Sequence, residues 1–456
     1  MKSKVSRHHP LSSVEKRAAW SLSMIYASRM LGLFMIFPIF SLYASDLEAS
    51  TPALVGLALG AYGLTQALLQ VPFGLLSDRW GRKPVIAFGL IIFLLGSVIA
   101  AEAETIYGVI AGRALQGCGA IASAVMALAA DLSRESQRTK LMATLGISIG
   151  GAFMLAMILG PILANYLALS GIFYLTALLA FVAVVVLFRI VPTPVRSTHH
   201  RDAQASPAQF IHLLKNPELL RLDIGIFCLH LMVTCGFVAF PFILVDMGIE
   251  TRWHWGVYLP VMLGALFVMV PMIIVAEAKK KMKQVFLVCI LGLAFAGWLL
   301  AANQSTAIFY FAVLLFFSAF NTLEALLPSL VSKIAPPDQK GSAMGLYSSS
   351  QFLGAFCGGV LGGWIHGAYD VFATFWLIAG VAILWFVVAM TMKKPQPLKS
   401  YMVKIGVSNQ ERAAASANRL SGLPGVKEVV VVADEGVAYL KADPRELDEE
   451  ALYRSL

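Results

Sequence analysis

Charged side chains are scarce in this chain. Asp, Glu, Lys and Arg together make up 13% of the 456 residues, whereas a soluble domain carries about a quarter. Hydrophobic residues make up 58% of the chain, and its mean hydropathy is +0.76. This scarcity of charge excludes an ordinary water-soluble protein and predicts that most of the chain lies in a lipid bilayer.

Cysteine and other ligand-forming residues are few as well. The five cysteines all lie inside apolar runs, which argues against a disulfide framework and predicts packing roles. Because the sequence has neither a nucleotide-binding loop nor a cluster of metal ligands, we expect no enzyme, no cofactor and no metal site. A removable signal peptide is not expected, since no short apolar core ends in a small-residue cleavage site. The cysteines are Cys118, Cys228, Cys235, Cys289 and Cys357.

Lys and Arg are almost absent from alternate loops. One set of loops contains only Arg252, whereas the other set and the amino-terminal segment collect the basic residues. The formal charge of +9 therefore indicates membrane topology rather than a nucleic-acid partner. Because positive residues stay on the cytoplasmic side, we expect a multi-pass protein of the inner (plasma) membrane with both termini in the cytoplasm.

Twelve segments are long and apolar enough to cross a bilayer, for which a helix needs about 20 residues. The predicted spans are 18–43, 53–77, 84–102, 105–131, 141–166, 171–191, 222–246, 255–277, 284–303, 306–334, 342–366 and 370–392. They divide into an amino-terminal half, 1–191, and a carboxy-terminal half, 222–394, separated by a cytoplasmic linker, 192–221, rich in Pro, Ser, His and charge.

The two halves share a repeated segment. VPFGLLSDRWGRK begins at Val71, and VPMIIVAEAKKKM begins 199 residues later (270 − 71) at Val270. Each copy follows the second span of its half, and Asp78 aligns with Glu277. A parallel repeat of two six-span halves is typical of transporters.

Residues 400–456 have the composition of a soluble domain. Their pattern predicts a strand at 401–407, a helix that ends near Gly422, a hairpin that turns at 434–436 and a second helix from Pro444. This βαββα order indicates a small ferredoxin-like module whose closing strand is missing, which suggests self-association through an open edge.

The loop Gly74-Leu-Leu-Ser-Asp-Arg-Trp-Gly-Arg-Lys83 resembles the hallmark loop of the major facilitator superfamily, G-x-L-x-D-R-x-G-R-K. Basic residues alone would indicate only an anchoring loop, but the Gly and Asp spacing favours the family motif. The resemblance implies an all-α membrane protein with twelve transmembrane helices in two six-helix pseudo-repeats, followed here by the α+β ferredoxin-like domain. It also implies a conformational latch in which Asp78 caps the start of span eleven near Ser342, and Arg82 pairs with Asp131. The latch residues are Gly74, Asp78, Arg79, Gly81, Arg82, Lys83, Asp131 and Ser342.

Two further motifs resemble patterns of this family. Arg113 and Gln116 match the family's span-four pattern R-x-x-Q-G-x-G, in which the arginine is tied to proton coupling. Span five carries Gly150 and then Gly160-Pro161, which resemble the span-five motif of the drug/proton antiporter branch, although Ala156 and Ala164 replace expected glycines. The alternatives are an arginine that snorkels to the interface and small residues that only permit close packing.

Ionisable residues inside spans are candidate sites because charge in lipid is costly. Glu324 is the favoured proton carrier, since burial favours the protonated form of a carboxyl group. His230 is the second candidate, with packing as its alternative role. Arg29 stands in span one, where related drug exporters carry an acid, and this argues against a preference for cationic substrates. Tyr62, Gln66, Asn165 and Asn321 are candidates for polar contacts in the substrate cavity.

The tail resembles heavy-metal-associated domains in its LPGV step, but Ser408 to Glu411 stand where those carry Cys-x-x-C, so metal delivery is not expected. The sequence therefore predicts a secondary active transporter, specifically a proton-coupled efflux antiporter for small drug-like or metabolite molecules that works by alternating access. Its expected partners are the small-molecule substrate, protons and the lipid bilayer. The alternatives are a proton symporter or facilitator for sugars or other metabolites and, in a different class, a membrane receptor with a signalling tail.

Overall fold

A computed structural model describes residues 11–193, 213–302, 305–336, 339–394, 398–405, 410–432, 436–443, 445–448 and 452. The chain folds into two compact units. The first comprises Met1–Thr198, Thr234–Pro260 and Ala355–Thr374, and the second comprises His199–Val233, Val261–Gly354 and Phe375–Leu456.

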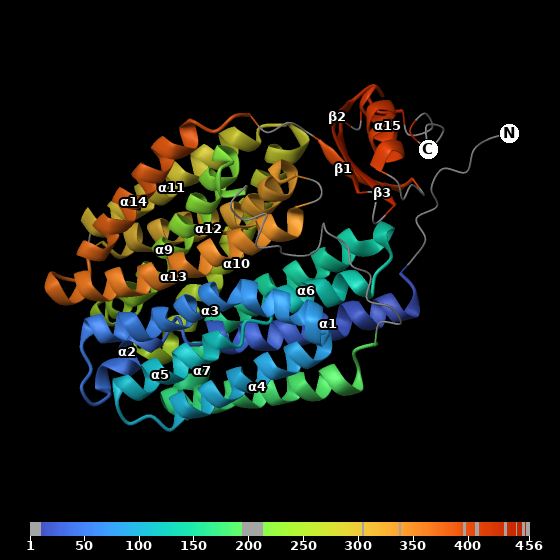
Figure 1. The fold of residues 1–456 in the computed structure, drawn as a ribbon. Helices are drawn as coiled ribbons and strands as arrows, with labels where there is room; N and C mark the ends of the chain where they lie inside the picture. Colours follow the sequence, from blue (N-terminus) through green and yellow to red (C-terminus); the bar gives the residue numbers. More distant parts are fainter. Residues whose placement is uncertain are drawn as a thin grey trace. The chain divides into compact units, whose positions relative to one another are not determined.

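The amino-terminal helices form most of the first unit (Figure 1). Here α1 packs on α7, and α4 packs on both α5 and α7. The helices are α1 (Ser13–Phe34), α2 (Phe40–Tyr43), α3 (Pro52–Trp80), α4 (Arg82–Ala101), α5 (Ile106–Cys118), α6 (Ala122–Asp131) and α7 (Glu135–Arg189), with a 3₁₀ turn η1 (Ala44–Asp46).

The start of α1 shows how local sequence sets a helix end. Ser12 and Glu15 form a capping box, in which each side chain accepts a hydrogen bond from the other residue's backbone N–H. Glu15 is also buried against Arg134, whose Nη2 lies 2.7 Å from Glu15 Oε2. These hydrogen bonds and the positive charge of Arg134 hold the pKa of the Glu15 carboxyl well below its usual range. The same carboxylate thus caps α1 and ties it to the loop before α7.

Predicted span four is not one continuous helix. The structure divides it into α5 and α6, with Gly119 to Ile121 between them. At this break the backbone of Gly119 lies against that of Gly89, so a Cβ at Gly119 would collide with α4. In α7 the backbone of Ala168 is non-helical (φ 53°, ψ −171°), and this break separates predicted spans five and six.

The second half of the chain supplies α9 (Pro217–Asp246), η3 (Thr251–Trp253), α10 (His254–Ala278), α11 (Met282–Ala302), α12 (Thr306–Ile334), α13 (Lys340–Ala368) and α14 (Ala373–Met390). Within the described ranges, nine helices are long and apolar enough to cross a membrane. Since α7 is broken into two spans, α1 and α13 complete the predicted twelve. Most of the predicted linker, 194–212, lies outside the described residues.

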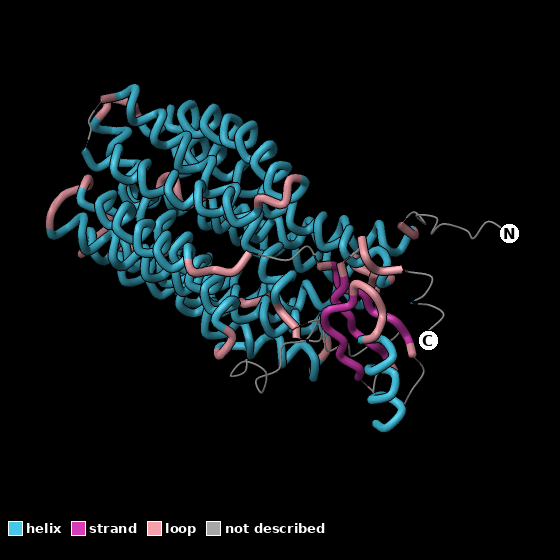
Figure 2. The backbone as a smooth tube through the Cα atoms, turned by 90° about the horizontal axis from the view of Figure 1, so that it is seen from above, coloured by secondary structure: helices cyan, strands magenta, loops and turns pink. Residues whose placement is uncertain are grey.

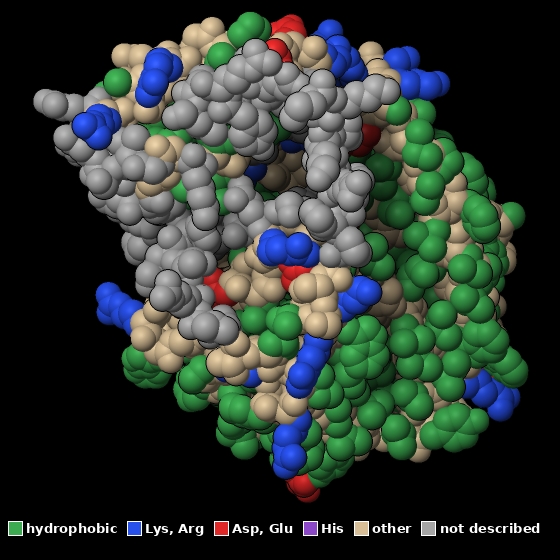
Figure 3. Space-filling view, turned by 90° about the vertical axis from the view of Figure 1, so that its right-hand side faces the viewer, with side chains coloured by type: hydrophobic (Ala, Val, Ile, Leu, Met, Phe, Trp, Pro, Cys, Tyr) green, Lys and Arg blue, Asp and Glu red, His purple; other side chains and the backbone are tan. Residues whose placement is uncertain are grey.

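Many helices leave a hydrophobic stripe uncovered. In α4 the exposed side chains include Phe88, Ile91, Leu95 and Ile99, whose spacing of three or four residues places them on one helix face. Figure 3 shows a broad green surface of hydrophobic side chains along its right side, whereas Lys and Arg gather on the face toward the viewer. Such a surface is suited to contact with lipid tails.

The first unit contains helix segments from both sequence halves. The ring of Phe37 stacks on that of Phe237 in the second part of α9, with centroids 5.3 Å apart. Near the start of α3, Gly56 approaches α13 so closely that a Cβ on Gly363 would lie 2.8 Å from the Gly56 Cα. Small residues thus let α3 and α13 meet backbone to backbone.

The tail forms β1 (Lys399–Lys404), α15 (Gln410–Ser421), β2 (Val426–Val432) and β3 (Val437–Ala442). Figure 2 shows the three strands side by side in magenta. Their order is β1-β3-β2, and β3 runs antiparallel to both neighbours. The predicted strand, helix and hairpin are therefore present, and the arrangement is that of a ferredoxin-like βαββ unit. Most of the predicted second helix lies outside the described residues.

Candidate functional site

The hallmark loop joins α3 to α4. Gly81, at φ 93°, lets the chain reverse between the two helices, a backbone conformation that other residues rarely adopt. Arg82 is 6% exposed and contacts Asp78 in the last turn of α3. Its other partners are Ser77 Oγ at 2.8 Å and Asp131 Oδ2 at 3.3 Å. Arg82 therefore links the ends of α3, α4 and α6 on one side of the first unit.

Other latch residues have separate neighbours. Lys83 Nζ donates to the carbonyl oxygen of Val191 at 2.6 Å, beyond the end of α7. Gly74 faces Ser123 of α6, whose Oγ would lie 3.2 Å from an added Cβ, while Arg79 is exposed. Ser342 belongs to the second unit, so its contact with Asp78 stays a prediction.

A buried cluster with two arginines lies inside the first unit. Arg29 is fully buried, and its Nη2 donates to Gln66 Oε1 at 2.8 Å and to the carbonyl oxygen of Gly119 at 2.9 Å. Arg113 is 1% exposed and donates from Nη1 to Gln116 Oε1 at 2.8 Å. Thus the structure brings together residues predicted separately from spans one, two and four.

The ring of Tyr62 joins the two cations. It lies 5.7 Å from the Arg29 guanidinium and 5.2 Å from that of Arg113, within the range of cation–π attraction. Arg29 also lies 5.3 Å from the ring of Phe93. The cluster therefore stabilises two positive charges with aromatic faces and neutral oxygens.

Two further polar residues extend this cluster and were missed by sequence reasoning. Gln66 Nε2 donates to Gln70 Oε1 at 2.7 Å, and Gln116 Nε2 donates to Ser97 Oγ at 2.8 Å. Gln70 stands four residues after Gln66 in an otherwise apolar span, and this helical spacing is a signal that could have found it.

A second cluster lies in the second unit and contains an acid. Gln351 Nε2 donates to Glu324 Oε1 at 3.2 Å and lies 2.8 Å from His230 Nε2. His230 Nδ1 lies 3.9 Å from Glu324 Oε2. The Glu324 side chain lies well inside α12 and is 38% exposed as a whole, but its Oε2 atom is buried and has no hydrogen-bond partner among the described residues.

Asp223 and Tyr347 belong to the surroundings of this acid and were not predicted. The Tyr347 ring is buried and lies near both Glu324 and Asp223. Asp223 is 6% exposed in the second turn of α9. It stands at the edge of predicted span 222–246, and an acidic residue at the polar end of a helix is common, so the sequence did not single it out.

A family comparison decides the class of this protein. The model of the Major Facilitator Superfamily matches residues 22–282 and 281–404. The chain belongs to the Major Facilitator Superfamily. It is therefore a secondary transporter rather than an enzyme.

Individual relatives agree with the family. The chain is 46% identical to the inner membrane transport protein YajR of Escherichia coli (strain K12), over 94% of this chain and 95% of the relative. It is 26% identical to the multidrug resistance protein MdtH of Aeromonas hydrophila, over 76% and 87% of the two chains. Together with its apolar helices, the first similarity indicates a multi-pass transporter of the inner membrane.

Solved structures show the same fold. An inward-facing, occupied bacterial homologue of the human lysosomal transporter Spinster has a TM-score of 0.70 at 13% identity, covering 84% of this chain and 98% of that one. The nucleoside transporter NupG has a TM-score of 0.66 at 14% identity, covering 83% and 100%. The major facilitator fold expected from the hallmark loop is thus confirmed.

The remaining predicted residues of this transporter are dispersed. At Gly160 an added Cβ would lie 2.5 Å from the Met35 carbonyl oxygen, so α7 packs tightly there on the end of α1, beside Pro161. Gly150, in contrast, has open space where a Cβ would lie, and Asn165 is exposed. Asn321 stands one turn before Glu324 on α12.

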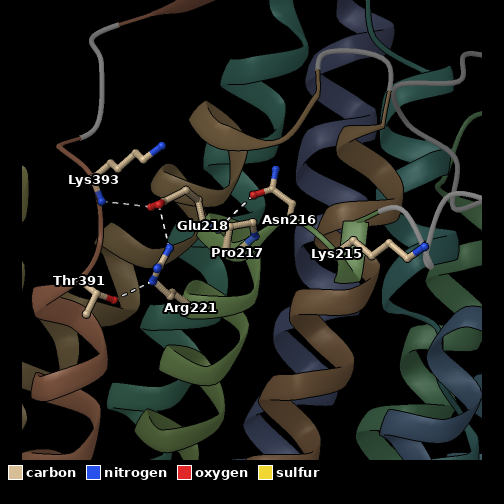
Figure 4. Close-up of a pocket in the computed structure, with 7 residues that line it drawn as sticks. All are labelled: Lys215, Asn216, Pro217, Glu218, Arg221, Thr391 and Lys393. Atoms are coloured by element: carbon tan, nitrogen blue, oxygen red, sulfur yellow. Dashed lines mark hydrogen bonds and ion pairs between the residues drawn. The ribbon is translucent and has the colours of Figure 1, made fainter.

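The residues that line the pocket in Figure 4 join two helix ends to each other and do not form a transport site. Arg221 pairs with Glu218 at 2.8 Å and donates to Thr391 Oγ1 at 2.8 Å. Glu218 also accepts from the backbone N–H of Lys393 at 3.2 Å. Because these charges satisfy one another, they join the start of α9 to the end of α14.

Lys441 joins the tail, residues 400–456, to a helix of its own unit. Lys441 in β3 is 2% exposed, and its Nζ donates to the carbonyl oxygen of Ile334 at 3.0 Å. Ile334 is the last residue of α12, and a positive charge is favourable at a helix carboxyl end. The helix that carries Glu324 is therefore capped by a residue of the tail.

Proposed function

We propose that this transporter exports small molecules in exchange for protons. The observation that carries the proposal is Glu324, a carboxylate inside a span whose Oε1 accepts from Gln351 and whose buried Oε2 has no hydrogen-bond partner among the described residues. Intramembrane acids of this kind are typical of proton relays. The drug-resistance names of relatives support export: besides MdtH, the bicyclomycin resistance protein homologue of Haemophilus influenzae is 31% identical over 38% of this chain and 42% of that one.

The hydrogen bonds around Glu324 support a defined proton exchange. Gln351 Nε2 donates to Glu324 Oε1 and lies 2.8 Å from His230 Nε2, so one amide group contacts both ionisable side chains. Deprotonated Glu324 accepts a hydrogen bond from Gln351. Protonation removes the negative charge of this acceptor and therefore weakens the hydrogen bond. We infer that arrival of a proton at Glu324 loosens the junction of α12 and α13 and thereby drives the conformational change.

Alternating access requires one side to close while the other opens, and packing inside the first unit supports closure at one end. The start of α3 meets the second part of α13 at Gly56 and Gly363, and Ser41 Oγ donates to the Phe237 carbonyl oxygen at 3.1 Å. We propose that both termini are cytoplasmic, which puts these segments on the outer side. We infer that this packing closes the outer end of the first unit and that the hallmark loop acts as the latch of the opposite side.

The proposal is tested by measuring whether substrate transport is coupled to proton movement. A substrate is first found by growth of cells lacking or overproducing the transporter on a panel of toxic compounds. The purified transporter is then placed in vesicles containing a pH indicator, and the compound is supplied on one side. Export in exchange for protons predicts a pH transient that Glu324→Gln abolishes and that the exposed control Glu250→Gln retains. A transient of the opposite direction would instead establish symport.

We also propose that residues 400–456 tune transport. The Lys441 contact supports this, because it acts on α12 without touching Glu324. Lys441→Met should change the transport rate by less than about tenfold and leave coupling intact, whereas the exposed control Lys427→Met should have no effect. Loss of all activity in a correctly inserted Lys441→Met protein would contradict tuning. The open edge of β1 is the expected site of self-association, which sedimentation of the whole transporter would detect.

A further inference from the structure

Arg29 is a buried cation whose hydrogen bonds are incomplete. Its side chain is fully buried, yet only Nη2 has acceptors, namely Gln66 and the Gly119 carbonyl oxygen. The Nε and Nη1 atoms are buried and have no hydrogen-bond partner among the described residues. Burial of a charge without full pairing is costly, and buried charges are ordinarily paired or hydrogen-bonded. Because the Arg29 guanidinium group remains buried without enough acceptors, we expect a further acceptor to come from a molecule that enters the transporter.

Among the described residues of the first unit, no acid forms a hydrogen bond with Arg29 Nε or Nη1. Its acidic residues stand within the first or last turn of a helix or in connecting loops, as Asp78 does near the end of α3 and Asp131 at the end of α6. Around Arg29 the structure instead places amide side chains, a carbonyl oxygen and two aromatic rings. Aromatic faces reduce the cost of the charge but do not cancel it.

A second cation strengthens the same electric field. Arg113 is 1% exposed and shares the ring of Tyr62 with Arg29. It too donates only to neutral oxygens, those of Gln116, Ala58 and Leu59. Two buried positive charges on one ring, without a described acid beside them, make the cluster attractive to an anion.

We propose that Arg29 binds the anionic group of the transported molecule, so that the substrate class of this transporter is small organic anions. The inference rests on the proposed function of transport. A carboxylate or phosphate would accept from the free Nε and Nη1 donors, as guanidinium groups commonly allow. Arg113 acts as a positioning residue, because it holds Gln116 and adds positive potential.

Binding can be measured without a gradient and without knowing the natural substrate. The full-length transporter, purified in detergent at constant ionic strength, is heated with benzoate, benzamide or benzamidine, which share a ring and carry negative, zero or positive charge. Inorganic phosphate forms a separate arm that distinguishes phosphate from carboxylate recognition. We expect at least one anion to raise the unfolding midpoint by about 2 °C or more in a concentration-dependent way, while benzamide and benzamidine do not.

Variants then assign the effect to Arg29. Arg29→Gln should abolish the anion-dependent shift and should itself unfold at a higher temperature without anion, because it removes an unpaired charge. Arg252→Gln, at an exposed outer position, should keep the shift. Arg29→Lys retains the charge but loses the guanidinium donors, and should require an anion concentration at least about tenfold higher, which keeps the test decisive if Arg29→Gln does not fold.

The outcomes separate this inference from the proposed coupling. Absence of a shift with both anions, an equal shift with benzamide, or a full shift in either Arg29 variant would overturn the anion site. A lower unfolding midpoint for a folded Arg29→Gln protein would assign Arg29 to structure and overturn it as well. Anion binding without a pH transient in vesicles would establish this site and disprove proton exchange. A pH transient driven only by a cationic compound would establish proton exchange and disprove the anion site.

Discussion

The two buried polar clusters of this transporter have opposite charge. The cluster in the first unit contains Arg29 and Arg113 and no described acid, whereas the cluster in the second unit contains Glu324, with Asp223 nearby and no described lysine or arginine among its hydrogen-bonded members. Lys and Arg of the second unit's spanning helices stand near helix ends, as Arg221 and Lys333 do. We propose that the first cluster binds an anion and the second a proton. On this proposal the repeated architecture places two separate tasks in two similar helix bundles.

The largest effect is expected from a change that leaves both clusters in place but blocks the conformational cycle. Asp78→Asn should abolish transport while leaving membrane insertion intact, because the latch acts on the whole conformational cycle and touches neither cluster. The anion-induced rise in unfolding temperature should persist in this variant. Measurement of transport in vesicles beside the thermal shift separates the two properties, and normal transport by Asp78→Asn would disprove the latch.

A smaller but clear loss should follow from disturbing the packing of α3 on α13. Gly363→Ala introduces a Cβ within 2.8 Å of the Gly56 Cα, and overpacking of this kind typically costs about 1–3 kcal/mol. Gly380→Ala is the matched control, because no atom lies within 4 Å of its added Cβ and alanine favours a helix over glycine. We expect a lower unfolding midpoint and slower transport for Gly363→Ala only. Equal behaviour of the two variants would contradict close packing as the basis of the closed form.

The acid cluster can be altered without touching Glu324. Asp223→Asn removes a second ionisable group near Tyr347, and we expect transport at a given pH gradient to fall severalfold without being abolished. The shift caused by benzoate or phosphate should be unchanged. The exposed control Asp46→Asn should leave both properties intact. If Asp223→Asn alters anion binding but not pH dependence, the division of tasks between the clusters is wrong.

The smallest effect concerns Glu15, outside both clusters. Because Arg134 lowers its pKa in the folded protein, Glu15 stabilises the fold at pH values above the unfolded carboxyl pKa of about 4.3, and this contribution is lost as the pH falls further. Unfolding midpoints from pH 7 to pH 3 should therefore fall less for Glu15→Gln than for the natural protein. Parallel curves would show that the ion pair adds nothing to stability.

Several features of this transporter could be predicted because they depend on neighbouring residues alone. The span 306–334 coincides with α12, and the hairpin of the tail is present as β2 and β3. The family followed from the resemblance of the Gly, Asp and Arg spacing between Gly74 and Lys83 to the family's hallmark loop, in which Gly81 permits the turn between the two helices. The candidate residues Arg29, Glu324 and His230 were found because a charge in an apolar run is conspicuous.

Other features could not be predicted, because they arise between distant segments. Nothing local marks the break at Gly119, whose carbonyl oxygen meets Arg29 from 90 residues away. Ser97 and Tyr347 look like ordinary helix residues in the sequence. Helix packing brings Gln116 within hydrogen-bond distance of Ser97 and places Glu324 near Tyr347. Asp223 was missed because its burial depends on neighbours rather than on its position near a predicted helix end.

The sequence by itself determined the apolar spans, the family and the presence of buried charges. A segment that crosses lipid must form a helix of sufficient length, and a charge inside it is costly and therefore usually functional. Only the tertiary structure decided which charges meet. It placed Arg29 and Arg113 on one tyrosine ring, and Glu324 beside Gln351 and His230. The physical reason is that helix packing sets the distances between residues far apart in sequence, and electrostatic function depends on those distances.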